Sequence, residues 1–484
     1  MIPQATSGRA AVLDAARRHL DSGDFVHDLA RRVAIRTESQ DAASGPALRS
    51  YLVDEIGPAL EALGCSFEVH ANPEPASGPL LIAHRHEDDA LPTVLVYGHG
   101  DVIRGQDKSW TRGGGPWALV QEGDRLYGRG SADNKGQHSI NIAALKVVLA
   151  ARGRLGFNLK WLLETGEETG SPGLAAFCSA ERDALSADVL IASDGPRLAR
   201  DRPTVFLGSR GVANFDLTLK LRAGAHHSGN WGGLLRNPGT VLANAIACLV
   251  DGRGVILVEA LRPPPIPANV RAALHGLTFG GDAGDPAVDA DWGEPGLTPA
   301  ERVIAWNTLE VLAYRTGNPE HPINAIPPDA RASMHMRFVV GTDVSRLAAV
   351  VREHLAAHGF ADIEVSEPTV MAATRLDPDN PWVRFVTASI ERSTGRAPVL
   401  LPNLGGSLPN DVFADILGLP TVWVPHSYAA CNQHAPDEHL LLPVVREALA
   451  LMTGIFWDLG EAGAGVEALP RRRRPARKRG DSAD

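Results

Sequence analysis

Three short apolar runs in the first 200 residues end in polar turns. They are TVLVYGHGD (93–101), FNLKWLLETGEE (157–168) and DVLIASDGP (188–196). Continuous apolar runs of this length, closed by turn residues, predict buried strands. Each run carries acidic or histidine residues at its carboxyl end.

A helix is predicted between the first two strands, over residues 136–153. Ile140, Ala143 and Val147 recur at helical spacing, and Gly153 suits the end of the helix. Strands that alternate with helices favour an α/β fold with a doubly wound, mostly parallel sheet. Such sheets bind ligands beyond the carboxyl ends of their strands, where the polar residues of the three runs would gather.

The pattern changes after about residue 208. Strands are predicted at 214–222, 331–340 and 361–367, and helices at 237–250 and 345–359. The two longer strands alternate apolar and polar positions, which is typical of an antiparallel sheet covered by helices on one side. We therefore predict an α+β domain at 209–368. Its stretch rich in Pro, Gly and Asp, about 262–300, reads as a long loop or lobe.

The αβ pattern then resumes, with a helix predicted at 380–395 and a strand at 419–426. The first domain is therefore interrupted by the second and completed afterwards. The predicted organisation is a first domain formed by 1–208 and 369–465, an inserted domain at 209–368 and a disordered basic tail at 466–484.

Composition places the chain among globular proteins. Of its 484 residues, 44% are hydrophobic and 21% charged. The first twenty residues lack an apolar stretch of signal-peptide type, and no apolar run reaches the ~18 residues of a membrane span. The four cysteines form no CxxC pair, so neither a thiolate zinc site nor a disulfide framework is indicated. We expect a cytoplasmic protein without membrane contact.

The net charge of −10 is unevenly distributed. The tail 471–484 holds seven basic and two acidic residues, a sum of +5, so the rest of the chain carries −15. An acidic body disfavours nucleic acid as the main partner. The tail itself reads as solvated disorder, with an RNA- or membrane-attracting arm as the alternative.

Seven ionisable residues lie at or near predicted strand ends: His99, Asp101, Asp133, Glu167, Glu168, Asp194 and His434. Imidazole nitrogen and carboxylate oxygen are the ligands that zinc and similar metals take. Two metals held ~3.5–4 Å apart need a bridging group and terminal ligands on each side. The set has the composition of such a site.

Glu167 and Glu168 are adjacent, which is costly if both are ionised away from water. A divalent cation beside them reverses this repulsion. Glu168 can then bind a metal, while Glu167 acts as general base towards the attacking water. The alternative is two solvated glutamates in a loop.

The motif HGD places His99 and Asp101 two residues apart, so on a strand both side chains point the same way. Asp101 could then accept a hydrogen bond from the second ring nitrogen of His99 and fix its tautomer. The alternative for an isolated motif of this kind is a simple turn.

The other residues of the set also have two interpretations each. Asp133 either caps the following helix or bridges two metals. Asp194 is a terminal ligand or a turn aspartate. His434 is a ligand or a loop histidine that faces solvent.

The segments YGHGDV, GRGSADNKG, ETGEETGSPG, SDGP and NQHAPDEH together resemble the M20 family of di-zinc metallopeptidases. The resemblance covers approximately residues 20–460, in the family's order and spacing. It implies two zinc ions, with manganese or cobalt as alternatives. It also implies a catalytic α/β domain with an inserted ferredoxin-like lid, which often forms the interface of a homodimer.

The resemblance assigns a role to each residue of the set. His99 and Asp194 would hold one ion. Glu168 and His434 would hold the other, and Asp133 would bridge the two. In addition, Glu167 would be the general base, and Asp101 would orient His99.

The lid carries three further matches. AHHSGNWGG (225–233) is similar to a family segment whose histidine, here His227, reaches the active site, often that of the partner subunit. An imidazole donor could stabilise the oxyanion there. Asn324 of NAIP and Arg337 resemble the pair that grips the substrate carboxylate, because a guanidinium binds a carboxylate bidentately. The alternative for Arg337 is a surface salt bridge.

The segment GGSLPND (405–411) resembles the family's glycine-rich substrate loop. Its backbone groups, including Gly406, and the hydroxyl of Ser407 could lie along a bound peptide.

The sequence thus predicts a di-zinc hydrolase of dipeptides or short peptides with a free C-terminal carboxylate. The alternative is an N-acyl-amino-acid amidohydrolase with the same metals. A binding protein that has lost catalysis is a hypothesis of another class, and the presence of every ligand together with Glu167 argues against it.

Overall fold

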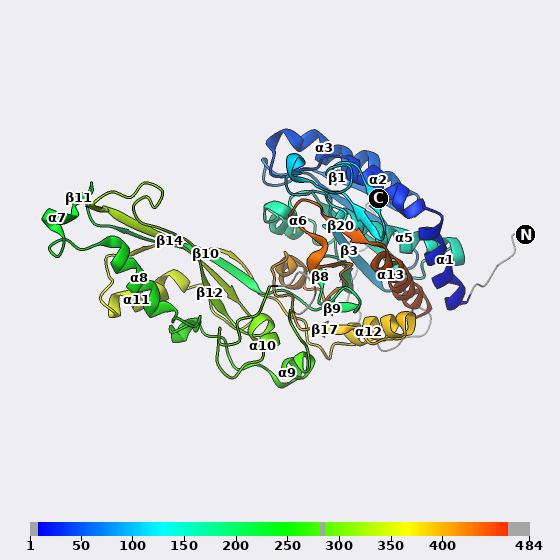
Figure 1. Ribbon diagram of the computed structural model, residues 1–484. Coiled ribbons are helices and arrows are strands. Elements are labelled where there is room, and N and C mark those ends of the chain that lie inside the picture. The colour runs from blue at the N-terminus through cyan, green and yellow to red at the C-terminus, as the bar shows by residue number, and fades with distance from the viewer. Residues whose placement is uncertain (1–7, 281–285, 463–484) are drawn as a thin grey trace, which may run out of the picture. The chain divides into compact units, whose positions relative to one another are not determined.

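The computed structural model describes residues 8–280 and 286–462 (Figure 1). The basic tail predicted at 466–484 lies outside the described residues. The chain forms two compact units. The first contains the described residues up to Val205, Asp379–Val399 and the segment from Val412 onwards, and the second contains Phe206–Pro378 and Leu400–Asp411. Residues 369–378 and 400–411, assigned above to the returning part of the first domain, therefore belong to the second unit.

An eight-stranded mixed sheet forms the centre of the first unit. Its order is β1 (Ser66–His70), β2 (Leu80–Arg85), β6 (Asn158–Glu164), β3 (Thr93–His99), β7 (Val189–Ala192), β18 (Thr421–Trp423), β9 (Thr204–Phe206) and β17 (Val399–Leu401). The neighbours β6, β3, β7 and β18 run parallel, whereas β1 and β2 add antiparallel strands at one edge. The strands predicted from the three apolar runs and from 419–426 are confirmed.

Helices cover both faces of this sheet. The helix predicted at 136–153 is α5 (Lys135–Arg152), which connects β3 to β6. It is buried on nearly all sides, because α13 (Leu442–Ala462), α1 (Arg9–Asp21) and α2 (Asp24–Ala34) pack over it. The helix α6 (Leu174–Ala180) lies on the opposite face (Figure 1). The connection from β3 to β6 and the connection from β6 to β7 run in opposite directions across the sheet, so right-handed crossovers place their helices on opposite faces.

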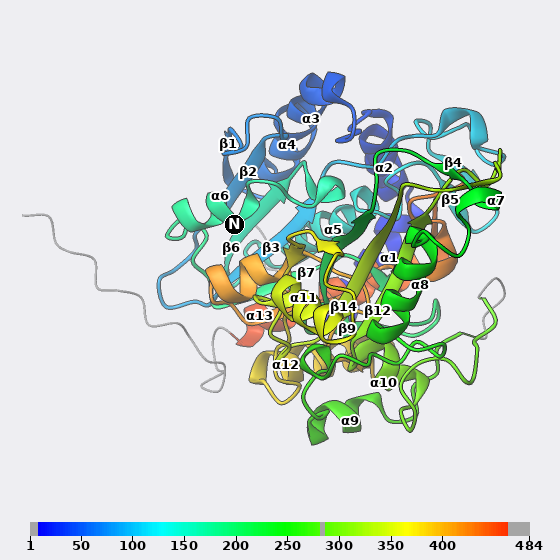
Figure 2. The same ribbon diagram turned by 90° about the vertical axis from the view of Figure 1, so that its left-hand side faces the viewer.

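The second unit has the β-α-β-β-α-β order of a ferredoxin-like fold. Its elements are β10 (Gly211–Lys220), α8 (Pro238–Leu249), β12 (Thr308–Arg315), β14 (Asp329–Phe338), α11 (Leu347–Ala357), β15 (Glu364–Val365) and β16 (Thr369–Met371). The antiparallel sheet has the order β12-β14-β10-β15, with β16 also paired to β10. Side by side, α8 and α11 cover one face of it (Figure 2).

Alternation along the strands explains this layering. Phe215, Leu217 and Leu219 of β10 are buried together with Met334 and Met336 of β14, against the two helices. The predicted α+β character of this region and its principal strands and helices are confirmed. The strand predicted at 361–367 is reduced to the two residues of β15.

The stretch at 262–300 is more ordered than a loop. It contains α9 (Ala268–Leu274), and α10 (Pro299–Ile304) begins at its end with a capping box between Thr298 and Glu301. Apolar residues of both helices form a small separate core. The density of Pro and Gly concealed these short helices.

The remaining helices and strands are short, apart from α12 (Pro381–Thr394). They are α3 (Gly45–Ser50), α4 (Gly57–Glu61), the sheet of β4 (Val120–Glu122), β5 (Arg125–Tyr127) and β20 (His439–Leu441), the pair β8 (Pro196–Arg197) and β19 (Ser427–Tyr428), the pair β11 (His226–His227) and β13 (Ala325–Ile326), α7 (Ser228–Trp231), and α12. Helix α12 confirms the prediction at 380–395. No helix within the described residues has the length and apolarity needed to cross a bilayer.

Candidate metal centre

The predicted ligands follow the carboxyl ends of parallel strands. His99 is the last residue of β3, and Asp194 comes two residues after β7. Glu167 and Glu168 form a 3-10 turn after β6, and Asp133 lies two residues before α5. Because neighbouring parallel strands end at the same edge of a sheet, their side chains meet there.

Two groups of ligand atoms share one aspartate. The first is His99, Asp133 and Asp194, and the second is Asp133, Glu168 and His434. Within each group, one ligand atom of every residue lies within 4.8 Å of the others. The structure thus brings together all five residues predicted to bind metal, from segments more than 330 positions apart.

The carboxylate of Asp133 faces both groups. Its Oδ1 lies 3.0 Å from Nε2 of His99, and its Oδ2 lies 3.3 Å from Nε2 of His434. The two oxygens thus point to different imidazoles, as a bridging carboxylate requires. The peptide bond that follows Asp133 is cis.

Asp194 offers an oxygen without a hydrogen-bond partner. Its Oδ1 accepts from the amide of Gly195 at 2.6 Å. Its Oδ2 is buried and has no hydrogen-bond partner, and it lies 3.7 Å from Nε2 of His99. A buried unsatisfied carboxylate oxygen is costly unless a cation or a donor meets it. The residues present therefore fit a bound metal.

The two adjacent glutamates have different surroundings. Oε2 of Glu168 lies 2.9 Å from Nε2 of His434, inside the second ligand group. Glu167 belongs to neither group, although its Oε2 comes within 4.0 Å of Nε2 of His99. One carboxylate is therefore placed as a ligand, and its neighbour stands beside the ligand groups.

Asp101 holds the glutamate turn. Its two carboxylate oxygens accept hydrogen bonds from the amides of Glu167, at 3.2 Å, and Glu168, at 3.1 Å. Nδ1 of His99 donates to the carbonyl oxygen of Asp101 at 3.1 Å, while the carboxylate is 3.5 Å away. The nearer acceptor for the imidazole is thus the main chain. The carboxylate fixes the position of both glutamates, a contact that the sequence did not reveal.

Burial and crowding raise the pKa of three carboxyl groups. The pKa of Glu167 lies well above its ordinary value, mainly because of burial and then because Asp194 and Glu168 are close. The same causes, with Asp133 as the neighbour, raise the pKa of Glu168 to about 7 and of Asp194 to about 6. The pKa of Asp133 is lowered despite burial, because His434 and His99 contact it.

The pKa values of both imidazoles are also raised. Contacts with Asp133 and Glu168 raise the pKa of His434 to about 11. Although burial lowers the pKa of His99, its contacts with Asp101 and Asp133 raise it well above the ordinary value. The pocket therefore has more carboxylate than positive charge, and divalent cations would reverse this balance.

The loop that carries His434 is held in an unusual backbone conformation. Asn432, His434 and Asp437 all have φ values near +60°. A side chain in this left-handed region costs roughly 1–3 kcal/mol and persists where the surroundings impose it. Asp437 anchors the loop by accepting from the amides of Thr111 and Arg112.

Glu438 is a site residue that the sequence analysis missed. It is buried, and its carboxylate accepts from the amides of Gly130, Ala132 and Asp133 and from Nη1 of Arg129, at 2.8–3.0 Å. It therefore fixes the loop that presents Asp133. Its position in NQHAPDEH, the same segment that carries His434, was the sequence feature that could have indicated it.

Glu164, the last residue of β6, is a second unpredicted carboxyl group. It is buried behind the glutamate turn and accepts hydrogen bonds from the hydroxyls of Tyr97, at 2.7 Å, and Ser171, at 2.9 Å. Burial raises its pKa to about 7, with a further contribution from Asp101.

In the second unit, the structure brings His227 and Asn324 together. His227 pairs with Ala325 where β11 meets β13, and the amide of Ser228 donates to the carbonyl oxygen of Asn324 at 2.9 Å. Nδ1 of the exposed His227 accepts from the amide of Gly229 at 3.1 Å. Its proton is therefore on Nε2, which remains a hydrogen-bond donor.

The other predicted substrate residues form a separate group. Nη1 of Arg337 donates to Oγ of Ser407, next to Gly406, and this hydroxyl donates to the carbonyl oxygen of Arg210, both at 2.6 Å. Arg337 lies eight residues along β14 from Asp329, which is about 26 Å at the rise of an extended strand. Asn324 precedes that strand, so in one chain Asn324 and Arg337 lie towards opposite ends of β14.

Comparison with protein families assigns most of the chain to a family of peptidases. The model of peptidase family M20/M25/M40 matches residues 95–458. This range contains every residue of both ligand groups.

Comparison with individual proteins finds dipeptidases. The chain is 28% identical over 410 residues to the cysteinylglycine-S-conjugate dipeptidase of Corynebacterium striatum, covering 82% of this chain and 83% of the relative. It is 32% identical over 272 residues to the beta-Ala-His dipeptidase of Mus musculus, covering 53% of this chain and 54% of that relative. The second alignment thus spans only about half of either protein.

Among solved structures, the fold is similar to that of an M20 family metallo-carboxypeptidase from Sulfolobus solfataricus. The TM-score is 0.76 at 23% identity, over 90% of this chain and 99% of the other.

Proposed function

Because the chain belongs to peptidase family M20/M25/M40, we propose that it hydrolyses the amide bond of dipeptides or short peptides with a free C-terminal carboxylate. It is a metal-dependent hydrolase of that family, and the relatives named above are dipeptidases. The observation that carries the proposal is the pair of ligand groups that share Asp133, with Glu167 beside them.

The proposed cofactor is a pair of zinc ions. His99 and Asp194 would hold one, Glu168 and His434 the other, and Asp133 both. When bound, such ions supply Lewis acidity, which polarises the scissile carbonyl and lowers the pKa of water towards ~7. Mixed imidazole and carboxylate ligands also suit manganese or cobalt.

Glu167 takes the proton from the attacking water and later delivers it to the leaving amine. This role needs a carboxylate that stays unligated but within hydrogen-bond reach of the reacting atoms. Asp101 supports it by holding the amides of Glu167 and Glu168. Proton transfer by a positioned side chain contributes typically ~10²–10⁴-fold to the rate.

The substrate carboxylate is the proposed ligand of Arg337, with Ser407 and the backbone at Gly406 beside it. The exposed Nε2 of His227 would donate to the oxyanion, and Asn324 would act near it. Asn324 and Arg337 lie towards opposite ends of β14. We therefore propose that His227 and Asn324 complete the active site of a partner subunit.

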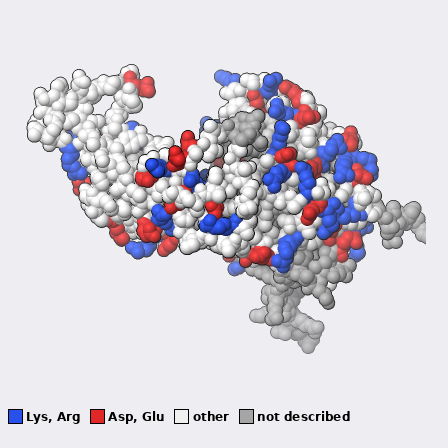
Figure 3. Space-filling model, turned by 60° about the horizontal axis from the view of Figure 1, so that its bottom comes forward, with Lys and Arg blue, Asp and Glu red and all other residues white. Residues whose placement is uncertain are grey.

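The surface of the second unit supports such a homodimer. Strand β12 is at the edge of the sheet, and its residues Leu312 and Tyr314 are exposed. Trp231, Leu234 and Ile323 are exposed near His227. In Figure 3, the end of the unit that carries α7 is largely uncharged, whereas basic and acidic residues intersperse on the visible face of the first unit. An interface between two copies would remove these apolar residues from water.

The test is a substrate panel with and without added metal. Purified protein is incubated with an S-substituted cysteinylglycine, β-Ala-His, other dipeptides and N-acetyl amino acids, and the products are separated by HPLC. We expect metal-dependent cleavage of dipeptides. Cleavage confined to N-acetyl amino acids would replace the proposal with the amidohydrolase alternative.

Glu167→Gln tests the general base. We expect the variant to keep its metals and to lose turnover by ~10²–10⁴-fold. Glu68→Gln, at a residue that is 79% exposed, is the matched control and should be fully active. Normal turnover in a metal-loaded Glu167→Gln protein would refute the role.

A further inference from the structure

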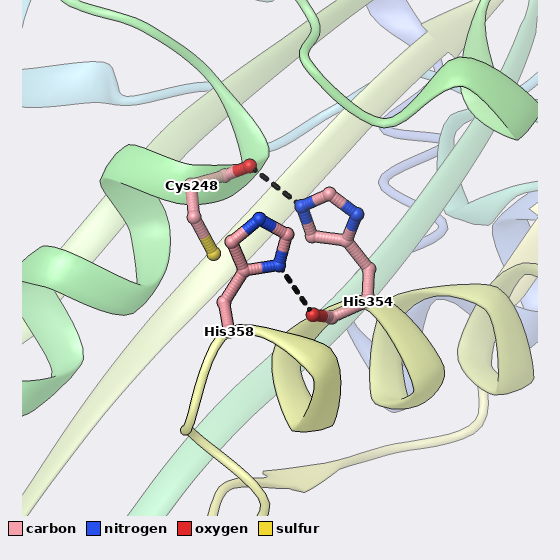
Figure 4. A group of neighbouring side chains, drawn as sticks. All are labelled: Cys248, His354 and His358. Carbon is pink, nitrogen blue, oxygen red and sulfur yellow. Dashed lines mark hydrogen bonds between the residues drawn. The ribbon is translucent and has the colours of Figure 1, made fainter.

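The second unit holds another group of metal-ligating side chains. It consists of Cys248 near the end of α8, His354 in the last turn of α11 and His358 just after it (Figure 4). One ligand atom of each residue lies within 4.8 Å of the others. Cys248 and His354 are half-buried and His358 is exposed, so the group is accessible from solvent.

The two histidines are spaced for chelation. They are four residues apart at the end of one helix and therefore share a face of it. Their rings stack with centroids 4.2 Å apart. Cys248 completes the group from the neighbouring helix, because α8 and α11 pack side by side on the sheet.

One of the two rings has a nitrogen free for a metal, whereas the other would exchange a hydrogen bond for the metal bond. Nδ1 of His358 donates to the carbonyl oxygen of His354 at 2.8 Å, which leaves Nε2 of His358 with a free lone pair. A bond from the second nitrogen to a main-chain carbonyl is the usual support of a metal-bound histidine. Nε2 of His354 donates to the carbonyl oxygen of Cys248 at 2.9 Å. Both acceptors are carbonyl oxygens near helix ends, where carbonyl groups commonly lack a partner within the helix. Capping of the two helices is therefore the alternative role of these histidines, and a test must distinguish it from metal binding.

We propose that Cys248, His354 and His358 form a separate metal site for a borderline cation such as Zn²⁺. Thiolate and imidazole are the ligands that zinc takes in proteins, and three of them leave a fourth position for water. At Zn–S and Zn–N distances of about 2.3 and 2.0 Å, ligand atoms lie roughly 3.3–3.6 Å apart. Because the present separations are within 4.8 Å, the group needs to contract by at most about 1.5 Å. Its position at two helix ends, next to Gly359 with φ +85°, allows such a movement.

Binding has a defined proton balance. The Cys248 thiol gives its proton to solvent as the sulfur–metal bond forms. Burial raises the pKa of this thiol, so the metal must displace a proton that the free group retains. Ligation through Nε2 of His354 exchanges its hydrogen bond to Cys248 for the metal bond and moves the ring proton to Nδ1.

Cobalt distinguishes this site from the dinuclear centre. The ligands of the centre are nitrogen and oxygen only, so a sulfur-to-cobalt charge-transfer band in the ultraviolet reports Cys248 alone. We expect wild-type protein titrated with Co²⁺ to show this band, and excess Zn²⁺ to abolish it. Cys248→Ser should lack the band. Loss of a residue that only hydrogen-bonds to a metal ligand lowers metal affinity by roughly 10–100-fold. Because His358 is proposed as a ligand itself, His358→Ala should lower the affinity for Co²⁺ by more than this.

Two variants serve as controls. Cys431→Ser removes a buried cysteine near His434, and His275→Ala removes an exposed histidine of the same unit. Both should keep the band. Alkylation of Cys248 by iodoacetamide, read by mass spectrometry, should slow when Zn²⁺ is present. The proposal is overturned if wild-type protein in excess Co²⁺ shows no band, or if the band survives in Cys248→Ser.

Discussion

The two ligand clusters found among the described residues are built in different ways. In the first unit, side chains from five separate segments meet at the carboxyl ends of parallel strands. Of these, His99, Glu168 and Asp194 are buried or nearly so. In the second unit, two histidines come from one helix end and a cysteine from the next helix, all of them at least partly exposed. The first cluster is rich in carboxylate, whereas the second carries no carboxylate.

This difference determines how much each cluster depends on a cation. The first concentrates negative charge away from water. Burial, and after it repulsion between neighbouring carboxylates, raises the pKa values of Glu167, Glu168 and Asp194. The second is electrically neutral when its thiol is protonated and its imidazoles are neutral. Its hydrogen bonds to helix-end carbonyls hold it together without a metal. We therefore expect tight, cooperative binding at the first and weaker, independent binding at the second.

Asp133→Asn should give the largest effect and separates the clusters directly. An amide has one acceptor oxygen and no charge, so it cannot bridge two cations. We expect the first cluster to retain at most one metal by elemental analysis and activity to fall below detection, while the Cys248 band in Co²⁺ is unchanged. Asp14→Asn, at a residue that is 57% exposed, should retain both metals. Full occupancy with normal turnover would mean that Asp133 does not bridge.

Glu438→Gln should have an intermediate effect. The substitution places an amide group against backbone N–H donors and leaves the buried Arg129 without its ionic partner. We expect metal affinity at the first cluster to fall by roughly 10–100-fold, with turnover restored at saturating metal. Glu461→Gln breaks an exposed ion pair with Arg152 and should change neither quantity. A loss of turnover that metal cannot rescue would assign Glu438 a role beyond positioning.

Glu164→Gln tests a buried carboxyl group of the first unit that binds no metal. It should have the smallest effect, and that effect should be on the free energy of unfolding alone. The pKa of Glu164 is about 7 in the folded protein, above the 4.5 of an ordinary glutamate. The folded state therefore holds a proton that the unfolded state releases, so this group's contribution to stability falls as pH rises from about 4.5 to 7. At 1.36 kcal/mol per pKa unit, the stability lost over this pH range through Glu164 is about 3 kcal/mol.

Urea unfolding of metal-free protein at pH 5 and pH 8 measures this contribution. Wild-type protein should lose more stability than Glu164→Gln between the two values. Glu74→Gln, at an exposed position, should follow the wild type. Parallel pH dependence of Glu164→Gln and wild type would show that Glu164 titrates normally.

Local pattern predicted most of the regular structure. The runs at 93–101 and 157–168 form strands because they are short, mostly apolar and closed by turn residues. The helix over 136–153 follows from its periodicity. The local pattern did not indicate α9 or α10, because glycine and proline are frequent in the stretch that contains the first and leads into the second. The local pattern also gives no sign of a ligand group at Cys248, because His354 and His358 lie about a hundred residues further on.

By itself, the sequence determined which residues could bind metal, because imidazoles and carboxylates that follow apolar strands are visible as a local pattern. It also determined the alternation that makes the second unit an antiparallel layer under two helices. Only the tertiary structure decided that Asp133 faces two imidazoles and that Asp101 and Glu438 hold backbone amides. It also decided that Asn324 and Arg337 lie apart in one chain. The physical reason is that hydrogen bonds and carboxylate contacts act over about 3 Å, and the chain positions that come so close are set by strand order and helix packing.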